Sequence, residues 1–214
     1  MLVDAAGTLI YPSEPAAEVY LKYASQYGCL LSTTEILANY RRAYSTPWDR
    51  TPSRYVADGR DFWRFIVSET TLISDEACFE AIYNHYAAAE AWSVAPGAPA
   101  ALASLRRAGV STAVVSNFDT RLRPLLGLLG LEQLFDAIVV SAEVGVEKPN
   151  PVIFDAACER LGCRPIEAVH VGDDRRNDVF GARDAGCWAW LWGVDVRSFE
   201  EVARRVLQPD AAED

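Results

Sequence analysis

The fold is decided by the first nine residues, Met1-Leu2-Val3-Asp4-Ala5-Ala6-Gly7-Thr8-Leu9. A short apolar run that ends at a glycine turn predicts a buried strand. The strand would stop at Asp4, at the carboxyl end where open parallel α/β sheets bind their ligands. A lone aspartate at such a position can also simply cap the following turn. Its meaning therefore depends on whether later strands also end in polar side chains.

The composition is that of an ordinary globular protein with an acidic surface. The chain has 214 residues, of which 50% are hydrophobic and 23% are charged, and this length suits one large domain or a core with an insertion. The formal net charge of -10 argues against broad binding of nucleic acid or anionic membranes. No apolar run is long enough to span a bilayer. We expect a small-molecule substrate, no nucleic-acid partner and no membrane partner, and the sequence sets no oligomeric state.

Cysteine usage and the amino terminus bear on the cellular compartment. The five cysteines are scattered and include no Cys-x-x-Cys pair. This pattern favours buried thiols in a reducing compartment over a disulfide framework or a zinc site. No signal or transit peptide is visible, although a strand that begins at residue 1 is an abrupt natural start. We expect a cytoplasmic protein or, if a leader was removed, one of an organelle such as the plastid or mitochondrion.

A block of helices interrupts the chain after the first strand. Apolar residues at helical spacing predict helices over 16–27, 32–44, 61–68 and 75–89. Ser32 with Glu35 predicts a capping box at the start of the second. The block is too long for a crossover helix. We therefore predict an inserted helical cap over 14–91, at the C-terminal edge of the sheet, and an α/β core over 1–13 and 92–214.

From residue 92 onward, strands and helices alternate. The predicted strands cover 110–115, 137–140, 168–171 and 188–192, and the predicted helices cover 97–109, 120–129, 151–161, 178–185 and a last one from Ser198. This alternation predicts a doubly wound parallel sheet. The tryptophan-rich segment 188–192 fits a buried strand better than a stacking platform. Ser198 with Glu201 predicts a second capping box, and the acidic tail over 209–214 is expected to fray.

Polar residues at four places in this pattern can converge on one site. They are Asp4, Ser116 with Asn117, Lys148, and Asp173 and Asp174 with Asp178. Carboxylates from different strand ends suit a hard cation such as Mg²⁺, and a hydroxyl, backbone amides and an ammonium suit a phosphoryl group. Lys148 is one of only two lysines in a chain that otherwise uses arginine. Taken singly, the Ser-Asn pair could form a turn, the lysine could be a solvated charge, and the Asp-Asp pair could cap a helix. Their joint order along the chain and their places at strand ends favour one common site.

These residues resemble the motifs of a known family. The segments Asp-Ala-Ala-Gly-Thr-Leu at 4–9, Val-Ser-Asn at 115–117, Lys-Pro at 148–149 and Val-Gly-Asp at 171–173, with Asp178, are similar to the four motifs of the haloacid dehalogenase-like (HAD) hydrolases. The resemblance covers essentially the whole chain, including a helical cap inserted after the first motif. It implies an α/β fold in which a HAD-like Rossmannoid core, a doubly wound parallel sheet, carries an α-helical cap. The motifs are more specific for the fold than for the reaction.

The resemblance also implies roles for the motif residues that handle the phosphoryl group. Asp4 would be the nucleophile that attacks phosphorus and forms an aspartyl-phosphate. Ser116, the Asn117 amide and Lys148 would hold the transferring phosphoryl oxygens.

The metal site that the resemblance implies takes Mg²⁺. The ion would be held by the carboxylates of Asp4 and Asp173 and by the backbone carbonyl of Ala6. Asp178 would support the ion through water or through the other ligands, and Asp174 could do so too.

The first motif departs from the phosphatase pattern at Ala6. Phosphatases of the family carry a second aspartate there, which protonates the leaving group and later activates the attacking water. A methyl group cannot transfer a proton, and general acid–base catalysis contributes about 10²- to 10⁴-fold. Neither His85, in the predicted cap, nor His170, inside a predicted strand, is expected to replace this aspartate.

Three functions follow from this departure. The first is a Mg²⁺-dependent phosphatase that is slow or restricted to good leaving groups, and the second is a catalytically silent homologue with a binding or regulatory role. The third is another reaction of the family. It would be either phosphonate hydrolysis through a cap lysine, for which Lys22 is the only candidate, or 2-haloacid dehalogenation, in which Arg41 or Arg42 would receive the halide. Lys22 lies close to the first motif, and Asp173 and Asp174 without a cation would repel a carboxylate substrate. We therefore expect the first function.

The predicted cap is rich in aromatic and arginine side chains. They are Tyr40, Arg41, Arg42, Tyr44, Trp48, Arg50, Arg54, Tyr55, Phe62 and Trp63. Such side chains can stack on planar or anionic ligands, but aromatic residues at helical spacing also pack a helical core. We expect most of them to form the core of the cap itself.

Overall fold

A five-stranded parallel sheet lies at the centre of the computed structural model, which describes residues 1–51 and 53–208. The strands are β1 (Leu2–Val3), β4 (Ala113–Ser116), β5 (Ala137–Val140), β6 (Val169–Gly172) and β7 (Trp188–Leu191), in the order β5-β4-β1-β6-β7. β1 is central, and Val3 pairs with Val114 on one side and with Val171 on the other. The predicted doubly wound parallel sheet is confirmed, and the carboxyl ends of its strands share one edge.

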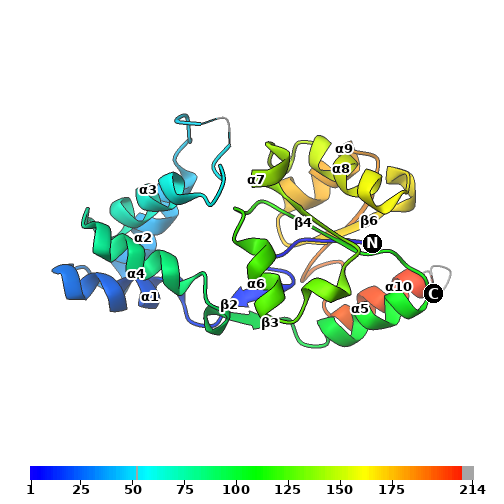
Figure 1. Cartoon of the computed structure of the whole chain (residues 1–214), viewed down its shortest axis with the longest axis horizontal. Helices are drawn as coiled ribbons and strands as arrows, with labels where there is room; N and C mark the ends of the chain where they lie inside the picture. The colour runs from blue at the N-terminus through cyan, green and yellow to red at the C-terminus, as the bar shows by residue number, and fades with distance from the viewer. Residues whose placement is uncertain (52, 209–214) are drawn as a thin grey trace.

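Helices cover both faces of this sheet (Figure 1). On one face lie α5 (Ala98–Arg107), α6 (Leu122–Leu128) and α10 (Phe199–Leu207), and on the other lie α8 (Val152–Leu161) and α9 (Gly181–Asp184). Successive residues of a strand point to opposite faces, so Val3 packs in the first apolar cluster and Leu2 in the second. Both side chains are fully buried. This explains why the first strand reads as a continuous apolar run rather than an alternating one.

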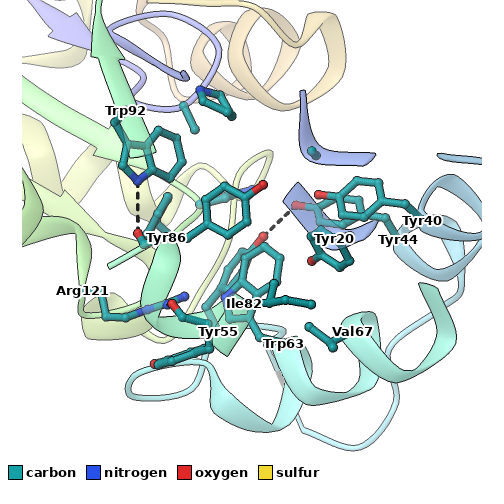
Figure 2. A pocket seen from close by; sticks show the side chains of 16 residues that line it. Tyr20, Tyr40, Tyr44, Tyr55, Trp63, Val67, Ile82, Tyr86, Trp92 and Arg121 are labelled. Atoms are coloured by element: carbon teal, nitrogen blue, oxygen red, sulfur yellow. Dashed lines mark hydrogen bonds between the residues drawn. The ribbon is translucent and has the colours of Figure 1, made fainter. Parts of the chain in front are cut away.

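Four helices form a separate group at one end of the molecule (Figure 1). They are α1 (Ala16–Ala24), α2 (Thr33–Ser45), α3 (Arg60–Thr71) and α4 (Glu76–His85), and they pack around an apolar cluster of their own. The predicted capping box of α2 is confirmed, because Glu35 N donates to Ser32 Oγ and Ser32 N donates to Glu35 Oε2. The rings of Tyr20 and Tyr40 meet edge to face between α1 and α2 (Figure 2).

A short antiparallel ribbon joins these helices to the sheet. β2 (Ile10–Pro12) pairs with β3 (Trp92–Val94), with Ile10 opposite Val94. A strand of three residues that ends in Pro12 is too short for its periodicity to mark it in the sequence. The ribbon brings the segments that enter and leave the four helices side by side.

Some predicted boundaries were wrong. The helix predicted over 178–185 begins earlier, with a π-helical turn over Arg175–Phe180 before α9, because Asp174 Oδ1 accepts hydrogen bonds from the amides of Arg176 and Asn177. Ser198 caps α10 as predicted, but Glu201 accepts from the Arg197 amide and not from that of Ser198. Shorter elements are α7 (Ser141–Val144) and 3₁₀ turns at Ser25–Tyr27, Ala89–Ala91, Glu132–Leu134 and Pro165–Glu167.

The predicted environment of the tryptophan-rich strand needs correction as well. β7 is an edge strand, and Trp188 at its start is 65% exposed, whereas Ala189 and Leu191 are buried. The tail over 209–214 lies outside the described residues.

Two expectations drawn from composition can be compared with the structure. All five cysteines are free, and all but Cys163 are buried, as expected. Within the part of the chain that the structure describes, no helix has both the length and the apolar character needed to cross a bilayer.

Candidate active site

Asp4 lies at the carboxyl end of the central strand and is only 5% exposed. Its amide donates to the Val171 carbonyl at 2.9 Å, which extends the pairing with β6 as far as this residue. The chain then turns tightly at Gly7, whose φ of +97° disfavours any residue with a side chain. A Cβ atom on Gly7 would lie 2.5 Å from Asp173 Oδ2. Gly7 is therefore needed both for the turn and for the approach of the second carboxylate.

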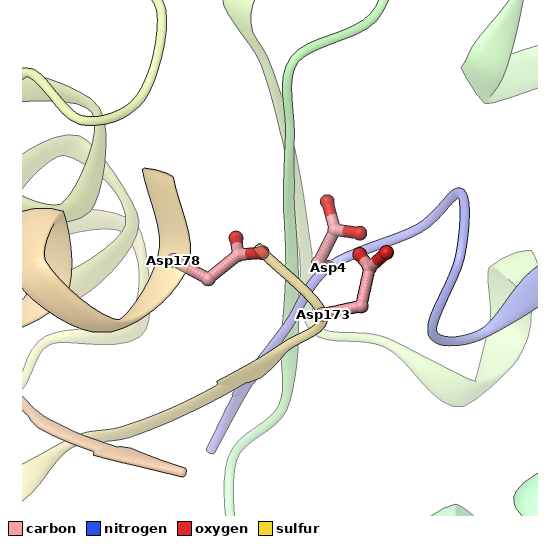
Figure 3. Close-up of side chains that lie close together, drawn as sticks. All are labelled: Asp4, Asp173 and Asp178. Atoms are coloured by element: carbon pink, nitrogen blue, oxygen red, sulfur yellow. The ribbon is translucent and has the colours of Figure 1, made fainter. Parts of the chain in front are cut away.

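Three carboxylates converge at this edge of the sheet (Figure 3). One oxygen from each of Asp4, Asp173 and Asp178 lies within 4.8 Å of the others. Asp173 follows β6, and Asp178 comes from the π-helical turn after it. Gly172 lacks a side chain where a Cβ would lie 2.2 Å from Asp178 Cγ. The structure thus brings together Asp4, at the end of β1, and the two aspartates that follow β6, as predicted from the sequence.

Lys148 lies inside this acidic cluster and is 4% exposed. Its Nζ donates to Asp4 Oδ1 at 2.6 Å, to Asp178 Oδ1 at 2.6 Å and to the Val115 carbonyl at 2.9 Å. The peptide bond from Lys148 to Pro149 is cis. One ammonium faces three carboxylates, so the ionised cluster keeps an excess of negative charge.

The pKa values of the cluster follow from burial and from these contacts. Burial raises the pKa of Asp4 to about 7, against the opposing effect of Lys148. Burial also raises the pKa of Asp173. Burial alone would lower the pKa of Lys148, but the carboxylates of Asp4 and Asp178 more than offset this and hold it above its ordinary value. The hard oxygen donors and the excess negative charge fit a divalent cation such as Mg²⁺.

Ser116 and Asn117 lie beside Asp4 at the end of β4. Ser116 is 1% exposed. The Asn117 carboxamide binds the backbone of Lys148 twice, through Nδ2 to the carbonyl at 2.9 Å and through Oδ1 from the amide at 2.7 Å. The side chain of Asn117 therefore fixes the Lys148 loop, a role the sequence analysis missed. Its backbone amide remains the group predicted to meet a phosphoryl oxygen.

His170 supports the acidic cluster from within the sheet. It is fully buried, and its Nε2 lies 2.9 Å from Asp178 Oδ1. Burial lowers the pKa of His170, so a neutral imidazole that donates from Nε2 accounts for the contact. The sequence placed His170 inside a strand and away from the acid–base role, but it did not predict the bond to Asp178. No periodicity in the sequence marks it.

We expect His170→Phe to weaken Mg²⁺ binding by about 10- to 100-fold, because a group that orients a metal ligand typically has an effect of this size. Phenylalanine keeps the ring that meets Phe154 but cannot donate to Asp178. Calorimetric titration with Mg²⁺ measures the change. The matched control is His85→Phe, on α4, where the imidazole instead contacts Tyr23. Equal Mg²⁺ affinity in both variants would show that His170 does not position Asp178.

Another buried carboxylate, outside the acidic cluster, ties the segment after Ser116 to the four-helix group. Asp119 is fully buried and accepts from Trp63 Nε1 on α3 at 2.8 Å. It also accepts from Arg121 Nε at 2.9 Å and Nη2 at 2.8 Å. Arg121 in turn lies 3.7 Å from the centroid of the Tyr83 ring on α4. Sequence reasoning missed this ion pair. It links the segment after β4 to α3 and α4 beside the site.

A cavity of about 200 Å³ lies between the four helices and the strand ends. Ala6, Asn117 and Phe118 line it from the sheet. The facing wall is built mainly from tyrosines and tryptophans, among them Tyr20, Tyr40, Tyr44, Tyr55, Trp63 and Tyr86 (Figure 2). The cap aromatics do form the core of the four-helix group as expected, since all six predicted from the sequence lie in or against its apolar cluster. Several of them face the sheet and form the roof of a cavity above Ala6.

The sequence and structure of this chain are similar to those of known proteins. A family model described as haloacid dehalogenase-like hydrolase matches residues 1–186. The chain belongs to this family. The fold and family that the sequence motifs implied for this HAD hydrolase are thereby confirmed.

Relatives of this HAD hydrolase include proteins named as phosphatases. Over 198 residues it is 32% identical to haloacid dehalogenase-like hydrolase domain-containing protein 3 of Xenopus laevis, across 88% of this chain and 81% of the relative. Over 86 residues it is 45% identical to a glyceraldehyde 3-phosphate phosphatase of Methanopyrus kandleri, across 40% of this chain and 37% of that protein. A HAD phosphatase from Thermococcus onnurineus has a similar structure, with a TM-score of 0.70, 26% identity, and coverage of 97% of this chain and 96% of the other.

The residues considered for other HAD reactions lie away from the cavity. Lys22 is exposed and pairs with Glu14 at 3.7 Å, and Arg41 and Arg42 are exposed on α2. None of these three is among the residues that line the cavity. The Asp174 carboxylate, considered as a further metal support, instead caps the helical turn that follows it.

Proposed function

We propose that this HAD hydrolase is a Mg²⁺-dependent phosphatase that acts on a small phosphorylated metabolite through an aspartyl-phosphate on Asp4. The observation that carries the proposal is the buried cluster in which Asp4 meets Lys148 at the sheet edge, with Asp173 and Asp178 close by. Relatives named as phosphatases support the reaction class.

Phosphoryl transfer to Asp4 would proceed in line. A carboxylate oxygen of Asp4 attacks phosphorus, and the bond from phosphorus to the leaving-group oxygen breaks. Lys148, 2.6 Å from Asp4, holds the nucleophile in place and offsets charge on the phosphoryl oxygens. The Ser116 hydroxyl and the Asn117 backbone amide donate to the same oxygens.

The metal ligands in this proposal are the carboxylates of Asp4, Asp173 and Asp178 and the backbone carbonyl of Ala6. Support comes from the three carboxylate oxygens within 4.8 Å of one another and from the single ammonium that opposes them. Bound there, Mg²⁺ would neutralise phosphoryl charge that the carboxylates alone would repel.

The missing acid at Ala6 sets the expected limit on turnover. Among the described residues that line the cavity, none carries a carboxyl group. The cavity tyrosines are poor substitutes, because burial raises the pKa of Tyr83 to about 12 and raises that of Tyr86 well above its ordinary value. The substrate should therefore have a leaving group that departs without a proton.

The cap in this proposal comprises residues 14–91, over a core of 1–13 and 92–214. The β2–β3 ribbon at the junction supports this division. Hydrogen bonds hold the cap against the core, since the Glu147 carboxylate accepts from the Arg54 amide at 2.6 Å and from Ser53 Oγ at 3.1 Å. A closed cap excludes water from the reacting groups.

The second candidate is a catalytically silent homologue with a binding or regulatory role. Ala6 is the observation that favours it. The residues that would bind the metal and the phosphoryl group are present, while the acid–base position holds a methyl group. The two candidates differ in whether bound phosphate ester is cleaved.

A comparison of two phosphate esters tests the proposed function. With Mg²⁺ present, we expect kcat/KM for 4-nitrophenyl phosphate to exceed that for glycerol phosphate by about 100-fold or more, since only the alkyl ester needs the missing acid. Chelation of the metal should remove both activities. If neither ester is cleaved while calorimetry shows that Mg²⁺ binds, the silent homologue is the better account.

A further inference from the structure

The cavity above Ala6 has the size of one aromatic ring. Its volume is about 200 Å³, and an engineered apolar cavity of about 150 Å³ in another protein admits benzene. Ala6 and Asn117, which flank the proposed phosphoryl position, form its floor. A group attached to the phosphoryl oxygen would therefore extend directly into this space.

The charge of the cavity walls disfavours an ionic group. Among the described residues, Arg121 is the only charged side chain that lines the space. Its guanidinium is already engaged by the fully buried carboxylate of Asp119 at 2.8 and 2.9 Å. A charged substituent would lose its hydration there without gaining a free counter-ion.

Hydrogen bonds within the protein engage three of the six tyrosine hydroxyl groups that line the cavity. Tyr44 and Tyr55 bond to each other at 2.6 Å (Figure 2), and Tyr83 donates to the Asp58 carbonyl at 2.7 Å. The lining also presents the faces and edges of many aromatic rings, which bind another ring in offset or edge-to-face geometry. The buried Tyr86 hydroxyl has no partner among the described residues, so it can meet one polar substituent on such a ring.

We propose that the cavity binds a single aromatic ring, so that the substrates are aryl phosphate monoesters. The inference rests on the proposed phosphatase function and adds the class of leaving group. It also gives Ala6 a positive role, because a methyl group completes an apolar floor where an aspartate would place a charge.

The bond changes balance without an acid at position 6. An Asp4 oxygen forms a bond to phosphorus, and the bond from phosphorus to the aryl oxygen breaks with its electron pair on that oxygen. The aryloxide leaves as an anion and takes a proton from water afterwards. A phenol has a pKa of about 10, far below the pKa of water, which an aliphatic alcohol resembles. Water then attacks the phosphorus of the aspartyl-phosphate, and the bond from phosphorus to the Asp4 oxygen breaks. Asp4 returns to a carboxylate, and inorganic phosphate leaves with the protons of the water.

Phosphonates carry no ester bond that the enzyme could cleave, so their binding tests the ring site separately from catalysis. With Mg²⁺ present, calorimetry should show that wild-type protein binds phenylphosphonate at least tenfold more tightly than methylphosphonate, and more tightly than cyclohexylphosphonate. Val67→Phe fills the cavity from α3 and should bring the phenyl-to-methyl ratio close to one. Ile82→Phe fills it from α4 and serves if the first variant fails to fold. Val152→Phe, at an exposed position on α8, is the matched control and should keep the wild-type ratio.

Two outcomes separate failure of the inference from failure of the proposed function. A phenyl-to-methyl ratio near one in the wild-type protein overturns the ring site, and hydrolysis of acetyl phosphate in the same preparation would leave the phosphatase standing. Acetyl phosphate has a good leaving group without a ring. If neither acetyl phosphate nor phenyl phosphate is cleaved, the phosphatase function fails, and the aryl-ester inference fails with it.

Discussion

Asp4→Asn should abolish phosphatase activity, with a loss on the order of 10⁴-fold or more, as expected when a nucleophile is removed. The carboxamide keeps the size of the side chain but lacks the charge needed to attack phosphorus. It also removes a negative charge that faces the Lys148 ammonium, whose Nζ lies 2.6 Å from Asp4 Oδ1 in the wild-type protein. Release of 4-nitrophenol with Mg²⁺ present measures the change.

The control for this variant is Asp155→Asn. Asp155 lies exposed on α8, so the substitution makes the same change in charge away from the cluster and should leave kcat unchanged. If Asp4→Asn kept more than a tenth of wild-type activity in a folded protein, Asp4 would not be the nucleophile.

Ala6→Asp should raise activity toward alkyl phosphates by about 10²- to 10⁴-fold, the usual contribution of general acid–base catalysis. The Ala6 side chain is exposed toward the cavity and lines it, so a carboxyl group has room next to the leaving-group oxygen. The gain in kcat/KM, which reports the step up to loss of the leaving group, should be smaller for 4-nitrophenyl phosphate, whose leaving group needs no proton. Steady-state kinetics on glycerol phosphate measures it.

Ala6→Asn is the matched control, since a carboxamide has nearly the same shape and transfers no proton. We expect it to keep the low alkyl activity of the wild-type protein. Equal rates for Ala6→Asp, Ala6→Asn and wild type would show that position 6 does not limit turnover.

The sheet and the charged centre of the site could be predicted because local sequence determines both. β1 is buried on both faces, so its apolar run is continuous and ends abruptly at Asp4. Parallel strands share a carboxyl edge, so Asp173 and Lys148 had to lie near Asp4 once the alternation of strands and helices was recognised. Gly7 and Gly172 then make room for the carboxylates of Asp173 and Asp178.

The supporting contacts could not be predicted, because they join residues far apart in the chain. Asn117 binds the backbone of Lys148 across 31 positions, and Trp63 reaches Asp119 across 56. His170 looks like any polar residue inside a strand until Asp178 is placed beside it. These pairings depend on tertiary packing and leave no periodic signal.

The aromatic cap shows a different limit of sequence reasoning. Helical spacing correctly places Tyr40 and Tyr44 on one face of α2, but it cannot say whether that face meets other helices or an open cavity. The structure shows that this face does both, since Tyr40 contacts Tyr20 and also lines the space above Ala6. The size of that space, and so the inferred substrate class, depends on how the cap lies on the sheet.

Trapping of the phosphorylated enzyme tests the central claim most directly. The protein would be mixed with 4-nitrophenyl phosphate and Mg²⁺, quenched in acid, and analysed by mass spectrometry intact and after proteolysis. The proposed mechanism predicts that a fraction of the protein gains one phosphoryl group, located on Asp4, and that Asp4→Asn gains none. An unmodified Asp4 while 4-nitrophenol is released, or a phosphoryl group on another residue, would contradict it.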